Sequence, residues 1–307
     1  MFQAFQIGSL ILWTRLLFVL LGLWFSTDLF FRLAASANLS LQHFREHGVW
    51  YILAFFLGGR LSAMLIDYQA YLKDPFRIIV LSDGGFSFIG GALGIAVVLF
   101  FATRGHRSTF LQWLDALLPA TTLGLVFDWV GAFFSGHAYG RPTNVFWGVT
   151  FDAMNVRYSV PIHPVQLYYA LFYFFLTFVL LIIRKKAKRV GTETLAGIVC
   201  ATLATFFLEN YRGDFGIPVF ANDMDFVLLV GLFLSLGFFA AFEQKLSKKF
   251  SFLYEFSVLL LAGGYLIARP FLNLETFEFR FSQLLALLAL LGTIVYIVDH
   301  RRRYPYL

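Results

Sequence analysis

Residues 109–134 read TFLQWLDALLPATTLGLVFDWVGAFF, an apolar run that carries only two carboxylates, Asp115 and Asp128. A helix needs about 20 mostly apolar residues to cross the hydrocarbon core of a bilayer, so this run is long enough to span one. Similar runs recur from one end of the chain to the other. They predict about nine membrane-spanning helices, near residues 8–31, 48–67, 85–103, 109–134, 162–183, 191–209, 224–242, 252–271 and 281–298.

The composition agrees with this interpretation. Of the 307 residues, 59% are hydrophobic and 14% are charged, and the mean hydropathy is +0.74. A chain of this kind has too little polar surface to cover a water-soluble globule. We therefore expect an all-α polytopic integral membrane protein, formed by one transmembrane domain over residues 1–307. The first apolar run lacks a small-residue cleavage site, so we expect it to be a retained helix.

The positive charges predict the orientation in the membrane. Four basic segments fall on alternate loops, at residues 104–107, 184–189, 243–249 and 300–303. Because Lys and Arg mark the cytoplasmic side, these loops are expected to face inward. The amino terminus is then outside and the carboxyl terminus inside. Since the loops are short and topology explains them, the sequence gives no reason to expect nucleic-acid binding.

The longest segment outside the predicted helices runs from about residue 135 to residue 162, on the outer side. It includes GAFFSGHAYGRPTNVFWG, residues 131–148, where His137, Arg141 and Asn144 stand among several glycines. The segment is too short to fold alone, so we predict a small head packed on the outer ends of the helices. A weak internal similarity also links residues 203–243 with 263–298, since each runs from a polar turn into a leucine-rich helix.

Polar groups at the membrane edge are the main candidates for function, because each is costly there unless it is paired or hydrated. The glycine-rich segment at residues 82–91 allows two interpretations. Gly90 and Gly91 could let two helices approach closely, or free N–H groups at a helix start could bind a phosphate. Arg60, which follows Gly58 and Gly59, could contribute a cation to the same phosphate.

Two histidines flank the head. His163 precedes Pro164 at the start of the predicted fifth helix, followed by Gln166 and Tyr168. These residues could simply cap the helix and lie at the interface. Alternatively, His163 and His137 could exchange a proton near neutral pH.

Glu209 and Arg212 are spaced i, i+3 and could form an ion pair on one helix face. An arginine partly freed from such a pair could hold a phosphodiester with two hydrogen bonds. His43 and His47 have a spacing compatible with metal binding but no evident third ligand. The sequence therefore predicts neither a metal site nor a cofactor.

Taken in order, several segments resemble one family, the bacterial prolipoprotein diacylglyceryl transferases. The most specific are GRPTNVFWGVTF (residues 140–151) and HPVQLYYA (residues 163–170). Further similar segments are GGRL (58–61), DPFRI (74–78), GGFSFIGG (84–91), LDALLPATTLGL (114–125) and FFLENYR (206–212). The resemblance implies a seven-helix core, here with a probable extra hairpin. It also implies an inner-membrane enzyme that moves the diacylglyceryl group of phosphatidylglycerol to the lipobox cysteine of a preprolipoprotein.

The chain departs from the family pattern at the positions that carry its chemistry. Ile89 stands where the family has a histidine, and Thr205 stands where it has an arginine. Trp129 and Ala132 replace an arginine and an asparagine, and Ser135 and His137 replace an asparagine and a glutamate. An alternative alignment places residues 265–269 at the position of the arginine replaced by Thr205. The resemblance thus implies a retained scaffold whose acid-base and lipid-binding residues are largely exchanged.

Two functions from different classes follow. The first is a diacylglyceryl transferase with a rebuilt site, in which His137 activates the nucleophile with Glu209 and Arg212 as further catalytic residues. Its lipid-binding residues would be Arg60, Gly90, Gly91, Gly140, Arg141, His163, Gln166 and Tyr168. The second is a non-catalytic binder of phospholipid or lipoprotein that keeps the family fold.

Overall fold

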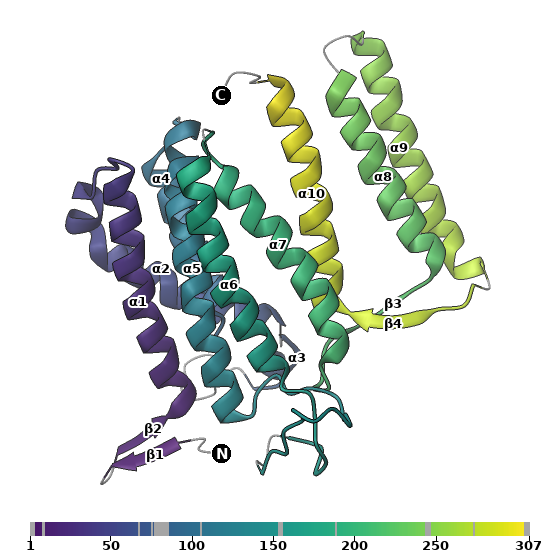
Figure 1. Cartoon of the computed structure of the whole chain (residues 1–307). Helices are drawn as coiled ribbons and strands as arrows, with labels where there is room; N and C mark the ends of the chain where they lie inside the picture. Colours follow the sequence, from purple (N-terminus) through teal and green to yellow (C-terminus); the bar gives the residue numbers. More distant parts are fainter. Residues whose placement is uncertain are drawn as a thin grey trace. The chain divides into compact units, whose positions relative to one another are not determined.

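The computed structural model describes residues 4–7, 10–66, 68–74, 76, 86–104, 106–152, 156–187, 189–242, 247–272 and 274–303. Residues 82–85 of the glycine-rich segment, residues 75, 77 and 78 of DPFRI and the side chain of His43 lie outside this description. Helices dominate the described part, and the strands are four residues long (Figure 1). The prediction of an all-α polytopic protein is confirmed.

Among the described residues, seven helices are long and apolar enough to cross a membrane. The bounds of these spans are Thr14–Ser36, Phe44–Leu65, Ser108–Ser135, Val165–Lys186, Thr192–Tyr211, Lys249–Phe271 and Phe281–His300. Phe88–Ala102 is a shorter apolar helix. A helix is present at each of the nine predicted segments, but nine as the number of spans stays a prediction.

The chain divides into two compact units, Met1–Phe215 and Gly216–Leu307. A single transmembrane domain over the whole chain stays a prediction. The first unit contains seven α-helices in its described part (Figure 1): α1 (Thr14–Ser36), α2 (Gln42–Ile66), α3 (Tyr68–Lys73), α4 (Phe88–Ala102), α5 (Arg107–Ser135), α6 (Val165–Lys186) and α7 (Thr192–Leu208). Helix α5 is central, because it packs against α1, α4, α6 and α7.

The amino-terminal end differs from the prediction. Instead of a helix from residue 8, strands β1 (Ala4–Ile7) and β2 (Leu10–Trp13) pair antiparallel, and α1 begins only at Thr14. β-branched and aromatic residues, which these segments contain, are common in strands. A short apolar segment can equally be the start of a membrane-spanning helix, so hydropathy alone does not separate the two. The first predicted helix was therefore wrong at its start and correct over the rest of its length.

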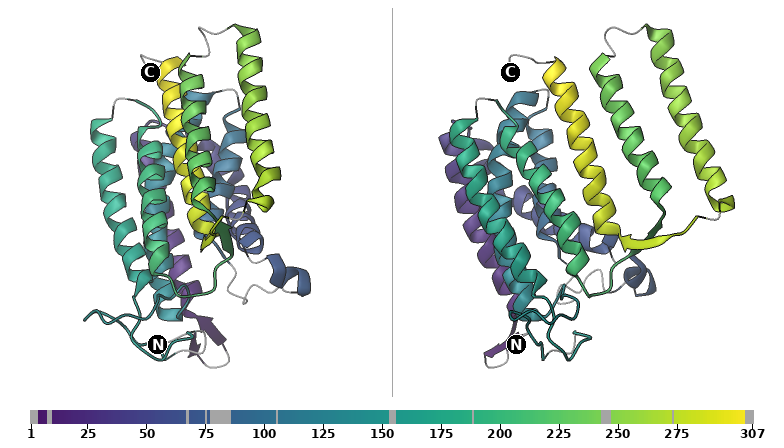
Figure 2. Two further views of the ribbon diagram at one scale, coloured as in Figure 1. Left: turned by 90° about the vertical axis from the view of Figure 1, so that its right-hand side faces the viewer. Right: turned by 45° about the vertical axis from the view of Figure 1, so that its right-hand side comes forward.

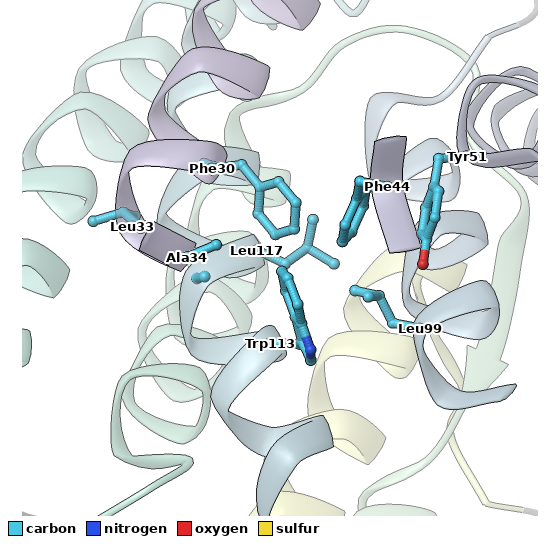
Figure 3. Close-up of a cluster of buried hydrophobic side chains, with 10 residues drawn as sticks. Phe30, Leu33, Ala34, Phe44, Tyr51, Leu99, Trp113 and Leu117 are labelled. Atoms are coloured by element: carbon cyan, nitrogen blue, oxygen red, sulfur yellow. The ribbon is translucent and has the colours of Figure 1, made fainter. Parts of the chain in front are cut away.

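An aromatic core joins α1, α2, α4 and α5 (Figure 3). The rings of Phe30 and Phe44 lie 5.3 Å apart, and those of Phe44 and Tyr51 lie 4.0 Å apart. Trp113 of α5 completes the group, with its ring 5.1 Å from that of Phe44. The cluster fixes the short α1–α2 connection against α5, because aromatic pairs at these distances add to the stability gained from burial.

Glycines set the packing of α2 against α4. A Cβ on Gly94 would lie 2.1 Å from the carbonyl oxygen of Ala54, so only glycine permits this approach. At the start of α4, the amide of Gly90 donates to Ser87 Oγ at 3.2 Å and that of Gly91 donates to Ser87 O at 3.0 Å. The geometry supports the helix-packing interpretation of this segment. Phosphate binding by Gly90 and Gly91 stays a prediction.

A buried carboxylate links α5 to the start of α7. Asp115 accepts hydrogen bonds from the amides of Gly191 (2.6 Å) and Thr194 (2.9 Å) and from Thr194 Oγ1 (2.7 Å). Arg184, near the end of α6, donates to Leu33 O of α1 at 2.7 Å and pairs with Glu193 at 3.2 Å. This network satisfies the free backbone groups of two helix ends and joins four helices.

The second unit repeats one pattern twice. Strand β3 (Pro218–Ala221) leads into α8 (Asp223–Phe242), and β4 (Phe277–Arg280) leads into α10 (Phe281–Arg303), while α9 (Lys248–Ala268) lies between them in sequence (Figure 2). The strands pair antiparallel. Asp225 Oδ2 accepts from the Asn222 amide, and Gln283 Oε1 accepts from the Arg280 amide, both at 2.9 Å. These matching caps give the internal similarity a structural basis.

Candidate active site

The candidate site begins where α5 ends. Gly136 takes a left-handed conformation with φ 70°, which favours glycine. The amide of His137 then donates to Ala132 O at 3.0 Å. The chain therefore reverses sharply at the end of α5, and His137 and Arg141 follow on one short segment of the head.

This segment is attached to the ends of two other helices. The Arg141 amide donates to Tyr211 O at 2.8 Å, and the Gly213 amide donates to Tyr139 O at 2.9 Å. A Cβ on Gly140 would lie 2.1 Å from His163 O, just before α6. The structure gives Gly140 a packing role between these segments, and its predicted contact with lipid stays a prediction.

Arg212 lies between two carboxylates. Its Nη1 donates to Glu209 Oε1 at 2.8 Å, and its Nε donates to Asp214 Oδ1 at 3.0 Å, with a second bond from Nη2 to Asp214. Burial alone would lower the pKa of the Arg212 guanidinium, but the two carboxylates raise it above its usual value. Tyr169 also donates to Glu209 Oε1 at 3.1 Å. The predicted Glu209–Arg212 pair therefore exists, and Asp214 binds the same guanidinium.

Ser135 lies beside the imidazole of His137, with its Oγ 3.0 Å from Nδ1. The single hydroxyl proton of Ser135 is directed to the carbonyl oxygens of Gly131 (2.9 Å) and Ala132 (3.2 Å). Toward Nδ1 of His137, 3.0 Å away, Ser135 Oγ can then only accept. This arrangement favours the tautomer of the neutral imidazole with the proton on Nδ1 and the lone pair on Nε2.

His137 is held in its neutral form. Burial, together with the positive charge of Arg15, lowers the pKa of His137 below 6.5, while Asp214 opposes the shift. Its backbone oxygen accepts from Nε2 of Gln166 at 2.8 Å. Gln166 is fully buried, and its Oε1 has no hydrogen-bond partner in the described part of the chain. The site thus contains a neutral base and an unused acceptor beside it.

Three aromatic side chains, of Trp147, Tyr168 and Tyr211, surround His163 just before α6. Trp147 Nε1 donates to the Tyr168 hydroxyl at 2.6 Å, which lies 3.1 Å from Nδ1 of His163. The ring of Tyr211 lies 5.1 Å from that of His163. Burial lowers the pKa of His163 as well. His163 and Tyr168 thus lie together, as predicted, within an aromatic cluster beside the loop that contains Arg141.

Arg141 is the cation most available to a ligand. Its Nε donates to Arg212 O at 3.0 Å, the side chain is exposed, and its two terminal nitrogens have no partner among the described residues. Arg15 lies 3.7 Å from Asp128 and also donates to Phe86 O at 3.2 Å. Arg60 stacks over the ring of Tyr71 on α3 at 5.2 Å. None of these contacts of Arg60 or Arg15 involves Arg141 or Arg212.

The replaced family position Trp129 lies directly against the cluster. Its ring stacks on that of Tyr169, with centroids 4.1 Å apart and planes 8° apart. Tyr169 in turn holds Glu209. The indole of Trp129 therefore packs against the residue that binds Glu209; the replacement of a family arginine at this position stays a prediction.

Three residues that contact the predicted site residues were not among those predicted: Ser135, Tyr169 and Asp214. Asp214 follows Arg212 by two residues, which is a usable signal for an ion pair. Ser135 and Tyr169 act through hydrogen bonds to His137 and Glu209, and their spacing gave no comparable signal. These contacts depend on how α5, α6 and α7 end, which only the structure provides.

Comparison with known proteins identifies the family of this chain. The sequence model of the prolipoprotein diacylglyceryl transferase family matches residues 3–298. The chain belongs to this family. Among similar proteins is a phosphatidylglycerol–prolipoprotein diacylglyceryl transferase of Idiomarina loihiensis, 31% identical over 57% of this chain and 65% of that protein.

Two further relatives carry the same name. The protein of Polynucleobacter necessarius subsp. necessarius is 33% identical over 61% of this chain and 67% of its own length. That of Finegoldia magna is 29% identical over 69% of this chain and 83% of its own length. The match to the Idiomarina loihiensis protein thus covers slightly less than two thirds of that relative.

Proposed function

We propose that this family member is a phosphatidylglycerol-dependent diacylglyceryl transferase with a rebuilt acid-base set. Its acceptor would be the thiol of a lipobox-bearing preprolipoprotein or a related nucleophile. The observation that carries the proposal is the Ser135–His137 pair, which leaves a lone pair on Nε2 of a neutral imidazole. A base must be unprotonated at the working pH to accept a proton, and His137 meets that condition.

Arg141 would bind the lipid phosphate. Its terminal nitrogens can give two parallel hydrogen bonds to phosphate oxygens, which a lysine cannot do. Arg212 and Glu209 would act by position: Arg212 O fixes Arg141 Nε, and the carboxylates fix Arg212. The roles of Arg60, His163, Gln166 and Tyr168 in lipid binding are part of the same proposal.

In the proposed step, the acceptor thiol displaces glycerol phosphate from the lipid. Nε2 of His137 takes the proton of the acceptor thiol, and the sulfur attacks the glyceryl carbon that bears the phosphate. A carbon–sulfur bond forms while the carbon–oxygen bond to phosphate breaks, and glycerol phosphate leaves. Arg141 stabilises the charge on the leaving group, and the imidazolium releases its proton to solvent.

The site would face the outer side of a bacterial inner membrane. The basic loops predict an inner carboxyl terminus and an outer amino terminus. Since α5 ends at the head, the candidate site lies at the end of the first unit remote from the basic residues that precede α5. Reporter fusions at each terminus would test this orientation.

The test uses purified protein in nanodiscs with phosphatidylglycerol and a lipobox peptide, followed by mass spectrometry of the peptide. His137→Ala should lower transfer by about 100-fold to 10,000-fold, the usual contribution of a general base. Arg141→Gln should raise KM for the lipid. Arg157→Gln, on another exposed arginine of the head, is the matched control. Full transfer by His137→Ala would refute the assignment.

One observation favours the alternative, a non-catalytic lipid or lipoprotein binder. Arg212 is neutralised by two carboxylates, and Trp129 fills an arginine position with an apolar ring. A binder would retain phosphatidylglycerol through purification and form no adduct with any acceptor peptide. In that case His137→Ala would leave the amount of bound lipid unchanged.

A further inference from the structure

A pocket of about 710 Å³ lies within the first unit, between α1 and α2. Residues of α4 and α5 also line it. We call it the α1–α2 groove; its lining includes Leu20, Trp24, Phe31, Gly48, Phe55 and Ala92. Trp24 is 75% exposed and Ile52, another lining residue, is 58% exposed. Since exposed apolar side chains form its walls on two membrane-spanning helices, the groove opens toward lipid.

The length of the groove matches one leaflet. On α1 the lining runs from Leu20 to Phe31, which at about 1.5 Å per residue is about 16 Å. Half of a hydrocarbon core of about 30 Å is about 15 Å. The aromatic floor of the groove, formed by Phe30, Phe44 and Tyr51, is visible in Figure 3. One acyl chain that starts at the α1–α2 turn would end near Leu20.

Charges mark the mouth of the groove. Asp28 lines it and pairs with Arg32, one turn closer to the α1–α2 turn, at 2.8 Å. Their side chains are 55% and 75% exposed. Both lie on a membrane-spanning helix, where exposed charges are costly unless they reach the interface or a polar partner. The ion pair joins Arg32 Nε to Asp28 Oδ2, so the terminal nitrogens of Arg32 could in addition bind a phosphate, and Oδ1 of Asp28 an ammonium.

We propose that the α1–α2 groove binds one acyl chain of an amine-bearing, zwitterionic phospholipid, with its phosphate at Arg32 and its ammonium at Asp28. The lipid belongs to the leaflet that borders the α1–α2 turn, which the predicted topology makes the cytoplasmic one. This site is separate from His137 and Arg141, because the groove is lined by Leu117, Ala120 and Thr121 in the middle of α5, whereas His137 and Arg141 follow the end of that helix. It does not depend on transferase activity.

Gly48 offers a direct test. It lines the groove, and a Cβ built on it meets no atom within 4 Å, so a larger side chain enters empty space. Gly48→Phe should fill the groove. Val49→Phe is the matched control, because Val49 is 69% exposed on the same helix and does not line the groove. Thermal unfolding of both variants checks that they fold.

The probe is phosphatidylethanolamine with a photoreactive acyl chain, in nanodiscs. Labelling of α6, whose Phe175 is 62% exposed, gives the level due to surrounding lipid. Wild-type protein should label residues 20–31 and 44–56 above this level, and Gly48→Phe should reduce that excess at least tenfold while Val49→Phe retains it. Equal excess in Gly48→Phe and wild type would overturn the groove site.

The headgroup assignment has its own test. A phosphatidylglycerol probe with the same reactive chain should label the wild-type groove less than the phosphatidylethanolamine probe does. Asp28→Asn should remove that preference, and Arg32→Gln should lower labelling by both probes. Equal labelling of the wild-type groove by the two probes would overturn the role of Asp28. Because the readout is labelling, loss of transfer in His137→Ala leaves this result unaffected.

Discussion

Replacing Ser135 with alanine tests the proposed origin of the basicity of His137. In the structure, Ser135 Oγ lies 3.0 Å from Nδ1 and is bound to two carbonyl oxygens, so it selects the imidazole with its proton on Nδ1. One such hydrogen bond contributes about 0.5–1.5 kcal/mol net. Without it the proton can move to Nε2, and the fraction of molecules with a free lone pair on Nε2 falls. We expect kcat/KM to fall about 2-fold to 10-fold.

Two assays separate this effect from a structural one. The nitrogen chemical shifts of His137, measured by NMR on ¹⁵N-histidine-labelled protein, should change from the Nδ1–H to the Nε2–H form in Ser135→Ala. Ser135→Thr retains the hydroxyl and should restore both the chemical shifts and kcat/KM. If the wild-type imidazole already carries its proton on Nε2, the assignment of the base is wrong.

Three further predictions concern pH, packing and stability. Because burial lowers the pKa of His137 below 6.5, the neutral base persists below that pH, and the acid limb of kcat/KM against pH should lie below 6.5. Gly140→Ala should destabilise the head by about 1–3 kcal/mol, since its Cβ would lie 2.1 Å from His163 O; limited proteolysis of the head measures this. Asp115→Ala removes three hydrogen bonds to Gly191 and Thr194, which should lower the free energy of unfolding by about 3 kcal/mol or more; thermal unfolding measures the loss.

Most of the fold followed from apolar length alone. The runs at 109–134 and 162–183 predicted α5 and α6 closely, because a helix in lipid satisfies its own backbone groups and needs little else. The prediction failed at residues 10–13, which pair as a strand with residues 4–7 instead of starting the first helix. Hydropathy does not distinguish a strand from the first turns of a span when the segment is short.

One contact of the candidate site followed from the sequence, and others did not. The i, i+3 spacing predicted the Glu209–Arg212 pair, because that spacing places both side chains on one helical face. Asp214 completes the same ion pair; its spacing of two residues from Arg212 permits the contact, but helical periodicity does not predict it, because Asp214 lies beyond the short helix at residues 209–211. Nor could the sequence show that Ser135 orients His137, because that contact depends on the reversal at Gly136.

The charges around the site explain how a rebuilt enzyme of this family could still bind an anionic lipid. Arg141 lies beside the ion pairs of Arg212 with Glu209 and Asp214, and Arg15 pairs separately with Asp128. Arg15 and Arg212 each have carboxylate partners, and in the described part of the chain Arg141 has none. A lipid phosphate can therefore bind Arg141 without displacing a carboxylate. In the proposed function, Arg212 would instead hold the backbone that orients Arg141, since its carbonyl oxygen accepts from Arg141 Nε.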